Sequence, residues 1–251
     1  MKKKLISLLL CGALLCGALA GCSSNSADTS DDSASATSQS EETTKTLTTA
    51  VGAELNTLYP LNMDVQNNIG TKLCYEGLVN YENGEVVPCL AESWEFSDDG
   101  KTLTFHLKEG VTFHDGTAFN AEAVKTDFDF AHPNPNFSNI SAVANVESIE
   151  VVDEYTVAFH YPTAYFAYLL DFCYPETMVL VSPAVLEEGN YQSMNGVVGT
   201  GPYIYDEIVD GEYVRFVRNE NYRSEQPYYD EVIVRYIPDA SASLPAPQSG
   251  E

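Results

Sequence analysis

Residues 88–124 constrain the fold of this chain more than any other stretch, because strand, turn and helix signals follow one another there without a gap. Asp99-Gly100 is a turn dipeptide between two strand-like runs, which predicts a β-hairpin. The run after this turn alternates apolar with polar residues, as a half-buried strand does. Its apolar positions are Leu103, Phe105 and Leu107. The stretch therefore predicts an antiparallel sheet with one buried face.

The same stretch then passes from the sheet into a helix. Asp115-Gly116 predicts another turn, and Asn120 is a residue type that favours the N-cap position. The residues after Asn120 place apolar side chains at helical spacing. These residues are Ala121, Val124, Phe128 and Ala131. A sheet that leads directly into an amphipathic helix indicates a mixed α/β fold.

Similar signals predict the other elements. Strands are expected over residues 47–51, 149–152, 155–160, 203–209, 213–218 and 232–237. Helices are expected over residues 67–78 and from Pro183 to about Gly189, the second with Ser182 as its N-cap. Hairpin turns are expected at Asn83-Gly84, Asp153-Glu154 and Asp210-Gly211. No internal repeat is visible.

The N-terminus has the pattern of an export signal. An apolar run over residues 5–19 follows three basic residues, Lys2, Lys3 and Lys4. The run is shorter than the roughly 20 residues that a membrane-spanning helix needs. Small residues then lead to Cys22, as in the lipobox where a bacterial lipoprotein is cleaved and acylated. We therefore expect a lipoprotein signal peptide over residues 1–21, with lipid on Cys22 anchoring the chain to the outer face of a membrane. An ordinary signal peptide with a chance cysteine is the alternative.

Residues 22–46 begin with the cysteine to be acylated and continue almost entirely with small, polar and acidic residues. Such a segment buries too little apolar surface to offset its ordering entropy, so it predicts a flexible tether. Folded sequence is expected from about Leu47.

The chain is strongly acidic, with 37 Asp and Glu against 12 Lys and Arg and a net charge of −25. This charge argues against nucleic acid and anionic lipid surfaces as partners. A cationic ligand is one interpretation, and diffuse surface charge on an exported domain is the more ordinary one.

Three cysteines remain after Cys22 and the two in the signal peptide are set aside: Cys74, Cys89 and Cys173. Because the number is odd, at least one is unpaired within the chain. A Cys74–Cys89 disulfide stays open on spacing alone, and buried free thiols are the default expectation. No two cysteines form a CxxC motif, so neither zinc nor thiol redox chemistry is indicated.

Motifs for catalysis or metal binding are not apparent. The sequence contains no GxSxG or HExxH motif, and the glycine-rich run at 196–201 lacks the Lys-Ser/Thr of a phosphate-binding loop. The histidines are not paired at helical spacing, which favours structural roles over metal ligation. They are His106, His114, His132 and His160. We therefore expect neither an enzyme nor a cofactor.

Four motifs occur in a consistent order along the chain. Besides residues 88–124, they are a Y-E-G-L segment within 73–79, a G-T-G-P-Y loop at 199–203 and an R-N-x-x-Y motif at 218–222. Together they resemble the family-5 extracellular solute-binding proteins, the oligopeptide, dipeptide and nickel receptors of ABC importers. The resemblance covers residues 47–251.

That resemblance implies the first lobe of a two-lobe periplasmic-binding-protein-like α/β fold, with the second lobe missing. Family members are about twice as long, and residues 248–251 look like a family motif cut in its middle, so residues 47–251 are expected to be an incomplete N-terminal lobe. The resemblance also implies a β-rich subdomain at about 80–180, attached to a sheet formed from both flanking segments. A genuine one-lobe protein is the rival interpretation.

The resemblance further implies ligand contacts in loops that face the crevice between lobes. On this basis Asn67, Asn68, Thr200, Gly201 and Tyr203 are the predicted ligand-binding residues. The alternative is that the two asparagines cap a helix and the glycines form a tight turn.

The function implied is that of an ABC-importer substrate-binding lipoprotein. It would capture peptides or similar small solutes, or chelated nickel, outside the cytoplasm and deliver them to a membrane permease. The matching region 171–182 contains no basic residue, which argues against nickel. The alternative from another class is a surface-anchored, single-lobe protein-interaction module without a small-molecule ligand.

Overall fold

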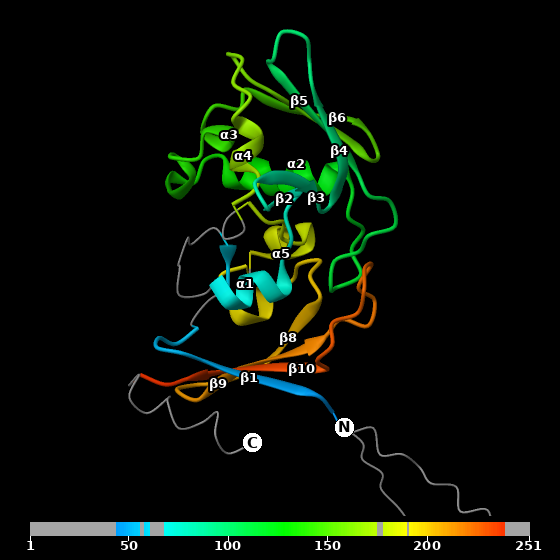
Figure 1. The fold of residues 1–251 in the computed structure, drawn as a ribbon. Helices are drawn as coiled ribbons and strands as arrows, with labels where there is room; N and C mark the ends of the chain where they lie inside the picture. Colours follow the sequence, from blue (N-terminus) through cyan, green and yellow to red (C-terminus); the bar gives the residue numbers. More distant parts are fainter. Residues whose placement is uncertain (1–43, 56–57, 61–67, 175–177, 190, 239–251) are drawn as a thin grey trace, which may run out of the picture. The chain divides into compact units, whose positions relative to one another are not determined.

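The described part of the chain contains two four-stranded sheets, each built from a different part of the sequence (Figure 1). The computed structural model describes residues 44–55, 58–60, 68–174, 178–189 and 191–238. All of these belong to one compact unit of the chain.

The first sheet joins the two ends of the described sequence. It contains β1 (Thr46–Val51), β8 (Tyr203–Val209), β9 (Tyr213–Arg218) and β10 (Glu231–Tyr236), in the order β1-β10-β9-β8. β1 lies parallel to β10, whereas β8, β9 and β10 pair as an antiparallel meander. The sheet expected from both flanking segments is confirmed.

The second sheet is the β-rich part expected near residues 80–180. It contains β4 (Ala91–Phe96), β5 (Thr102–Leu107), β6 (Ser148–Asp153) and β7 (Thr156–His160), in the antiparallel order β4-β5-β7-β6. A separate hairpin, β2 (Val79–Glu82) with β3 (Glu85–Pro88), precedes it. Asn83 and Gly84 both have positive φ in this hairpin turn, as the sequence predicts.

Helix α2 (Ala121–Ala131) covers the second sheet on its apolar face. The apolar side chains of β5 are buried and its polar ones are half-buried, so the predicted alternation is confirmed. Phe128 of α2 packs edge-on against Phe159 of β7, with ring centroids 4.9 Å apart. Asn120 caps the helix as predicted, since its Oδ1 accepts the Ala123 N–H at 3.0 Å.

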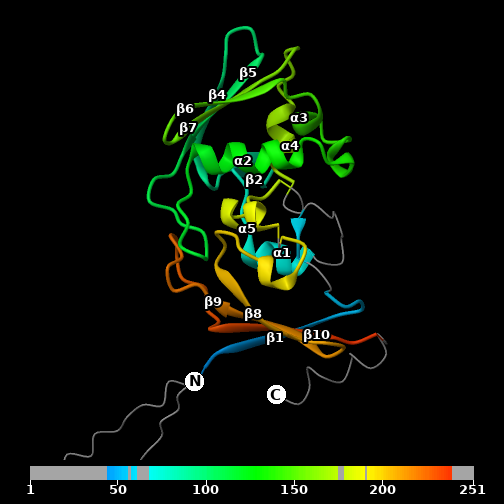
Figure 2. The same ribbon diagram turned by 180° about the vertical axis from the view of Figure 1, so that it is seen from behind.

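Short helices fill the space between the two sheets, as both views show (Figures 1 and 2). α1 (Asn68–Cys74) packs against β8, and α5 (Pro183–Glu188) packs against α2. The remaining short helices are η3 (Pro135–Phe137), α3 (Ser141–Ala144), α4 (Tyr168–Asp171) and η4 (Met194–Gly196).

Two expectations about helix ends need correction. The helix predicted over 67–78 ends at Cys74. The Gly201 N–H donates to the Cys74 carbonyl oxygen at 2.9 Å, and Gly77 then pairs with Val179 in a β-bridge. Ser182 occupies the N-cap position of α5, but its side chain does not cap the helix. Its hydroxyl instead donates to Asp115 at 2.6 Å and ties two loops together. Within the described part of the chain, no helix is both long and apolar enough to cross a membrane.

Candidate functional site

A groove of about 560 Å³ opens beside the segment that follows α1. Its walls also include the β2 strand, Cys89, the segment that follows α4, and Pro202 and Tyr222. The volume lies within the range of pockets that hold small ligands. Five of the sixteen described lining residues are aromatic: Tyr75, Tyr81, Phe172, Tyr174 and Tyr222.

Glu76 is the polar centre of this groove. Its side chain is only 10% exposed, and it forms an ion pair with the guanidinium of Arg223. Tyr222 donates its hydroxyl to one carboxylate oxygen at 2.8 Å, and Thr200 donates to the other at 2.9 Å. The carboxylate therefore has a counter-ion and two neutral donors, which is the arrangement a largely buried charge requires.

The electrostatics around Glu76 follow from burial and from this pairing. Burial acts to lower the pKa of Arg223, but the hydrogen bond and the charge of Glu76 more than offset it and raise that pKa. Burial, with the negative charge of Glu76 added to it, raises the pKa of the Cys89 thiol to about 11. Cys89 is therefore a neutral thiol in this groove at physiological pH.

Distant parts of the chain converge on Glu76. It comes from the Y-E-G-L segment, Thr200 from the G-T-G-P-Y loop and Tyr222 from the R-N-x-x-Y motif, at separations of 124 and 146 residues. Arg223 follows that last motif directly. The Y-E-G-L, G-T-G-P-Y and R-N-x-x-Y motifs thus meet at the carboxylate of Glu76.

The glycines of the G-T-G-P-Y loop allow it to pack tightly against the end of α1. A Cβ added to Gly199 would lie 2.1 Å from the carbonyl oxygen of Cys74, and one added to Gly201 would lie 2.6 Å from that of Leu73. His114 holds the loop from the other side, since one ring nitrogen lies 3.0 Å from the Gly201 carbonyl and the other accepts the Gly199 N–H at 3.4 Å. Burial lowers the pKa of His114, which favours the neutral ring that this pair of bonds requires.

A sequence profile described as "Bacterial extracellular solute-binding proteins, family 5 Middle" matches residues 85–251. The chain belongs to this solute-binding family. The match includes the whole second sheet and the two loop motifs that meet at Glu76.

Relatives of this chain differ in what their names say they bind. The nickel-binding periplasmic protein of Escherichia coli K12 is 31% identical over 79% of the chain, and the glutathione-binding protein GsiB of Pectobacterium atrosepticum is 31% identical over 80%. The solved structure of DppA from Helicobacter pylori, in complex with the peptide STSA, matches 82% of the chain with a TM-score of 0.72 and 27% identity. The chain spans 40% of the length of both curated relatives and 45% of that solved chain. The expected fold, one lobe of a periplasmic-binding-protein-like structure, is thereby confirmed.

None of the four predicted ligand-binding residues that the structure describes lines the groove. Thr200 is buried and contacts Glu76, while Gly201 packs against α1 and accepts Asn219 Nδ2 at 3.0 Å through its carbonyl. Tyr203 is buried, and its hydroxyl donates to the Tyr229 carbonyl at 3.1 Å. Asn68 is the first residue of α1, and Asn67 lies outside the described residues. Ligand contact by these five residues stays a prediction.

Sequence reasoning missed the residues that line the groove. Glu76 and Tyr222 stand inside the quoted motifs, so the signal was present but was used only to recognise the family. Tyr81 and Tyr174 belong to no motif. Their common surface arises from the fold, which brings β2 and the segment after α4 to one groove.

The structure also bears on the cysteines and on possible metal ligands among the described residues. Cys74, Cys89 and Cys173 are free thiols, so the Cys74–Cys89 disulfide does not form here. No group of three or more metal-ligating side chains is found among the described residues.

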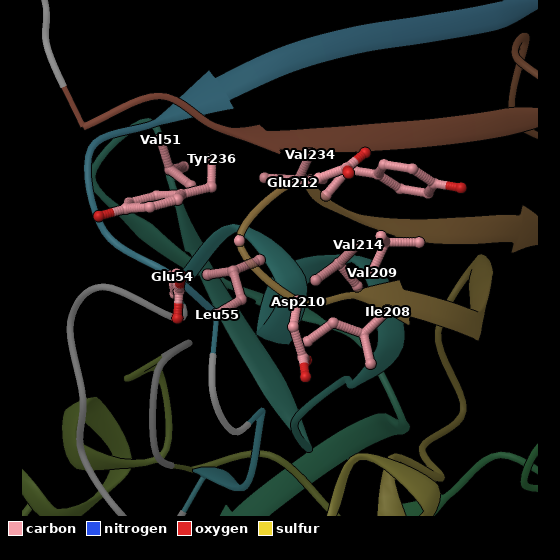
Figure 3. Close-up of a pocket in the computed structure, with 12 residues that line it drawn as sticks. Val51, Glu54, Leu55, Ile208, Val209, Asp210, Glu212, Val214, Val234 and Tyr236 are labelled. Carbon is pink, nitrogen blue, oxygen red and sulfur yellow. The ribbon is translucent and has the colours of Figure 1, made fainter.

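A second hollow lies where β1 and β10 end, lined by residues that include Glu54, Asp210 and Tyr236 (Figure 3). Its volume of about 20 Å³ accommodates little more than one water molecule. The larger groove is therefore the candidate site.

Replacing Gly201 by Ala is expected to lower the free energy of unfolding by about 2 kcal/mol, because the new methyl group meets backbone atoms that cannot rotate away. Urea unfolding followed by Trp94 fluorescence measures this change. Gly52→Ala is the matched control, since a Cβ there meets nothing within 4 Å. Equal stability of the two variants would show that the loop does not depend on this close approach.

Proposed function

We propose that the chain is the substrate-binding component of an ABC importer. In this proposal it captures peptides or similar small solutes in the groove beside Glu76 and delivers them to a membrane permease, without chemistry on the solute. One observation supports this proposal above the others. Three motif segments that lie far apart in the sequence meet at the carboxylate of Glu76, which is paired with Arg223 and lies in a groove large enough for a small ligand.

Family membership and the named relatives support this function. A relative described as periplasmic supports a location outside the cytoplasm. We further propose that residues 1–21 are a lipoprotein signal peptide, that Cys22 carries the lipid, and that residues 22–46 are a tether for the lobe that begins near residue 47. Mass spectrometry of the protein purified from bacterial membranes would detect the acyl groups on Cys22.

The binding function predicts heat on titration of the purified protein with at least one of three solute sets: short peptides, glutathione and chelated nickel. The Asn80→Trp variant should abolish that heat, because Asn80 is a half-buried residue of the groove lining and the larger ring fills the space. Val152→Trp is the matched control, since Val152 is 53% exposed on β6 and does not line the groove.

The proposal fails if none of the three sets produces heat or a rise in melting temperature. It also fails at this site if Asn80→Trp binds the solute as tightly as Val152→Trp does. Retained binding in the control together with lost binding in the groove variant supports solute capture in the groove.

A further inference from the structure

The groove lining is mainly aromatic and aliphatic. Besides its five aromatic residues, it includes Val79, Met178, Val179 and Pro202. Binding of an apolar ligand group to such a surface is favourable, because it removes apolar area from water. The free energy of binding becomes more favourable roughly in proportion to the area buried. It offers little to a ligand group that must keep its hydration.

Two tyrosines of the lining are unusually exposed. Tyr81 of β2 is 56% exposed and Tyr174, which follows α4, is 52% exposed. Among the other aromatic side chains of the described residues, only Tyr165, Phe166 and Tyr228 are exposed. Exposed aromatic side chains on two different segments of one groove are able to stack on a ligand that enters it.

The charges around the groove cancel. Glu76 is paired with Arg223, so its carboxylate does not offer a free negative charge to a cationic ligand. The other charged residues of the described lining, Lys72 and Glu82, are exposed and have opposite signs. The strong negative charge of the whole chain is therefore not concentrated in the groove.

We infer that the groove receives an uncharged, apolar or aromatic portion of its solute, and that its preferred class is short peptides with apolar or aromatic side chains. This inference rests on the proposed function and specifies the solute. Tyr81 and Tyr174 are its specificity-determining residues, because they are the exposed aromatic residues of the groove lining. The Glu76–Arg223 pair adds to the selectivity by keeping the polar centre of the groove neutral.

The test compares three tripeptides that differ only in the central residue: Gly-Phe-Gly, Gly-Glu-Gly and Gly-Lys-Gly. Calorimetry with the purified protein should show tighter binding of the phenylalanine peptide, by about tenfold or more, since burying a Phe side chain has an effect of that size. Tyr81→Ala and Tyr174→Ala should each weaken that binding by about fivefold through loss of ring contacts. Tyr228→Ala is the control, because Tyr228 is 69% exposed and does not line the groove.

The possible results distinguish failure of the inferred solute class from failure of the proposed function. Equal or tighter binding of a charged peptide overturns the inference and leaves solute binding intact. Unchanged affinity of the phenylalanine peptide in both groove variants also overturns it. If none of the three test tripeptides binds but glutathione or chelated nickel does, the inferred solute class is wrong. If no solute binds, the proposed function is wrong as well.

Discussion

Replacing Arg223 by Met is expected to lower the free energy of unfolding by about 3 kcal/mol, near the lower end of the cost of breaking a buried ion pair. The reason is that Glu76 would keep its charge and its neutral donors Tyr222 and Thr200 but lose its counter-ion. Both side chains of the pair are mostly buried, at 17% and 10% exposed, so water cannot replace the lost partner fully. Urea unfolding followed by the fluorescence of the single tryptophan, Trp94, measures the loss.

A matched control is available in the same part of the chain. Arg218 pairs with Glu220 and Asp230, but those carboxylates are 70% and 32% exposed. Arg218→Met should therefore cost only about 1 kcal/mol or less, as surface ion pairs do. A loss for Arg223→Met that is no larger than the loss for Arg218→Met would mean that Glu76 is solvated without its partner.

The double variant Glu76→Gln with Arg223→Met tests the cause. Gln removes the charge of Glu76 and leaves an oxygen that can accept from Tyr222, so the double variant should be more stable than Arg223→Met alone. If it is less stable, the contribution of Arg223 comes from packing rather than from charge.

Local pattern was sufficient to predict most strands and turns. The alternation of Leu103, Phe105 and Leu107 was informative because one face of β5 packs inside the core and the other does not. Asn83-Gly84 and Asn120 were informative because backbone conformation and helix capping depend on near neighbours in sequence. These elements needed no knowledge of the rest of the chain.

Most of the features that sequence reasoning missed depend on contacts between residues far apart in the sequence. The helix predicted to reach residue 78 ends at Cys74 because a loop over a hundred residues away supplies a hydrogen bond to its last carbonyl. Serine is a residue type that favours the N-cap position, but the hydroxyl of Ser182 donates to Asp115 instead of capping the helix. The pairing of Glu76 with Arg223 spans 147 residues, and no local period could indicate it.

One local signal was present and was not used. Asp127 stands at helical spacing with Val124, Phe128 and Ala131, so it belongs to the apolar face of α2. An acidic residue on such a face indicates either a hydrogen-bonded carboxylate or a carboxyl group that stays protonated. Asp127 is buried in the structure, and the Val181 N–H donates to its Oδ1 at 3.3 Å.

Asp127 is expected to make the protein less stable as pH rises. Burial raises the pKa of this carboxyl from 3.8 to about 8, although the hydrogen bond from Val181 acts to lower it. Between these two values the folded state binds a proton that the unfolded state does not, so the free energy of unfolding must fall as pH increases. The contribution of Asp127 is fully present below about pH 4 and is lost as pH rises through about 8, amounting to about 3–4 kcal/mol between pH 5 and pH 8.

The Asp127→Asn variant isolates this group, because Asn is neutral at every pH and its oxygen can still accept from Val181. Wild type and variant should be equally stable near pH 5, and the variant should be the more stable protein at pH 8, by about 3 kcal/mol. The comparison is needed because His114, with its pKa lowered by burial, changes stability in the opposite direction as pH falls below about 6.5. That contribution is common to both proteins and cancels in their difference. Parallel stability curves over this range would mean that Asp127 is ionised in the folded protein, and that the core around α2 stabilises its charge in a way that the single hydrogen bond from Val181 does not explain.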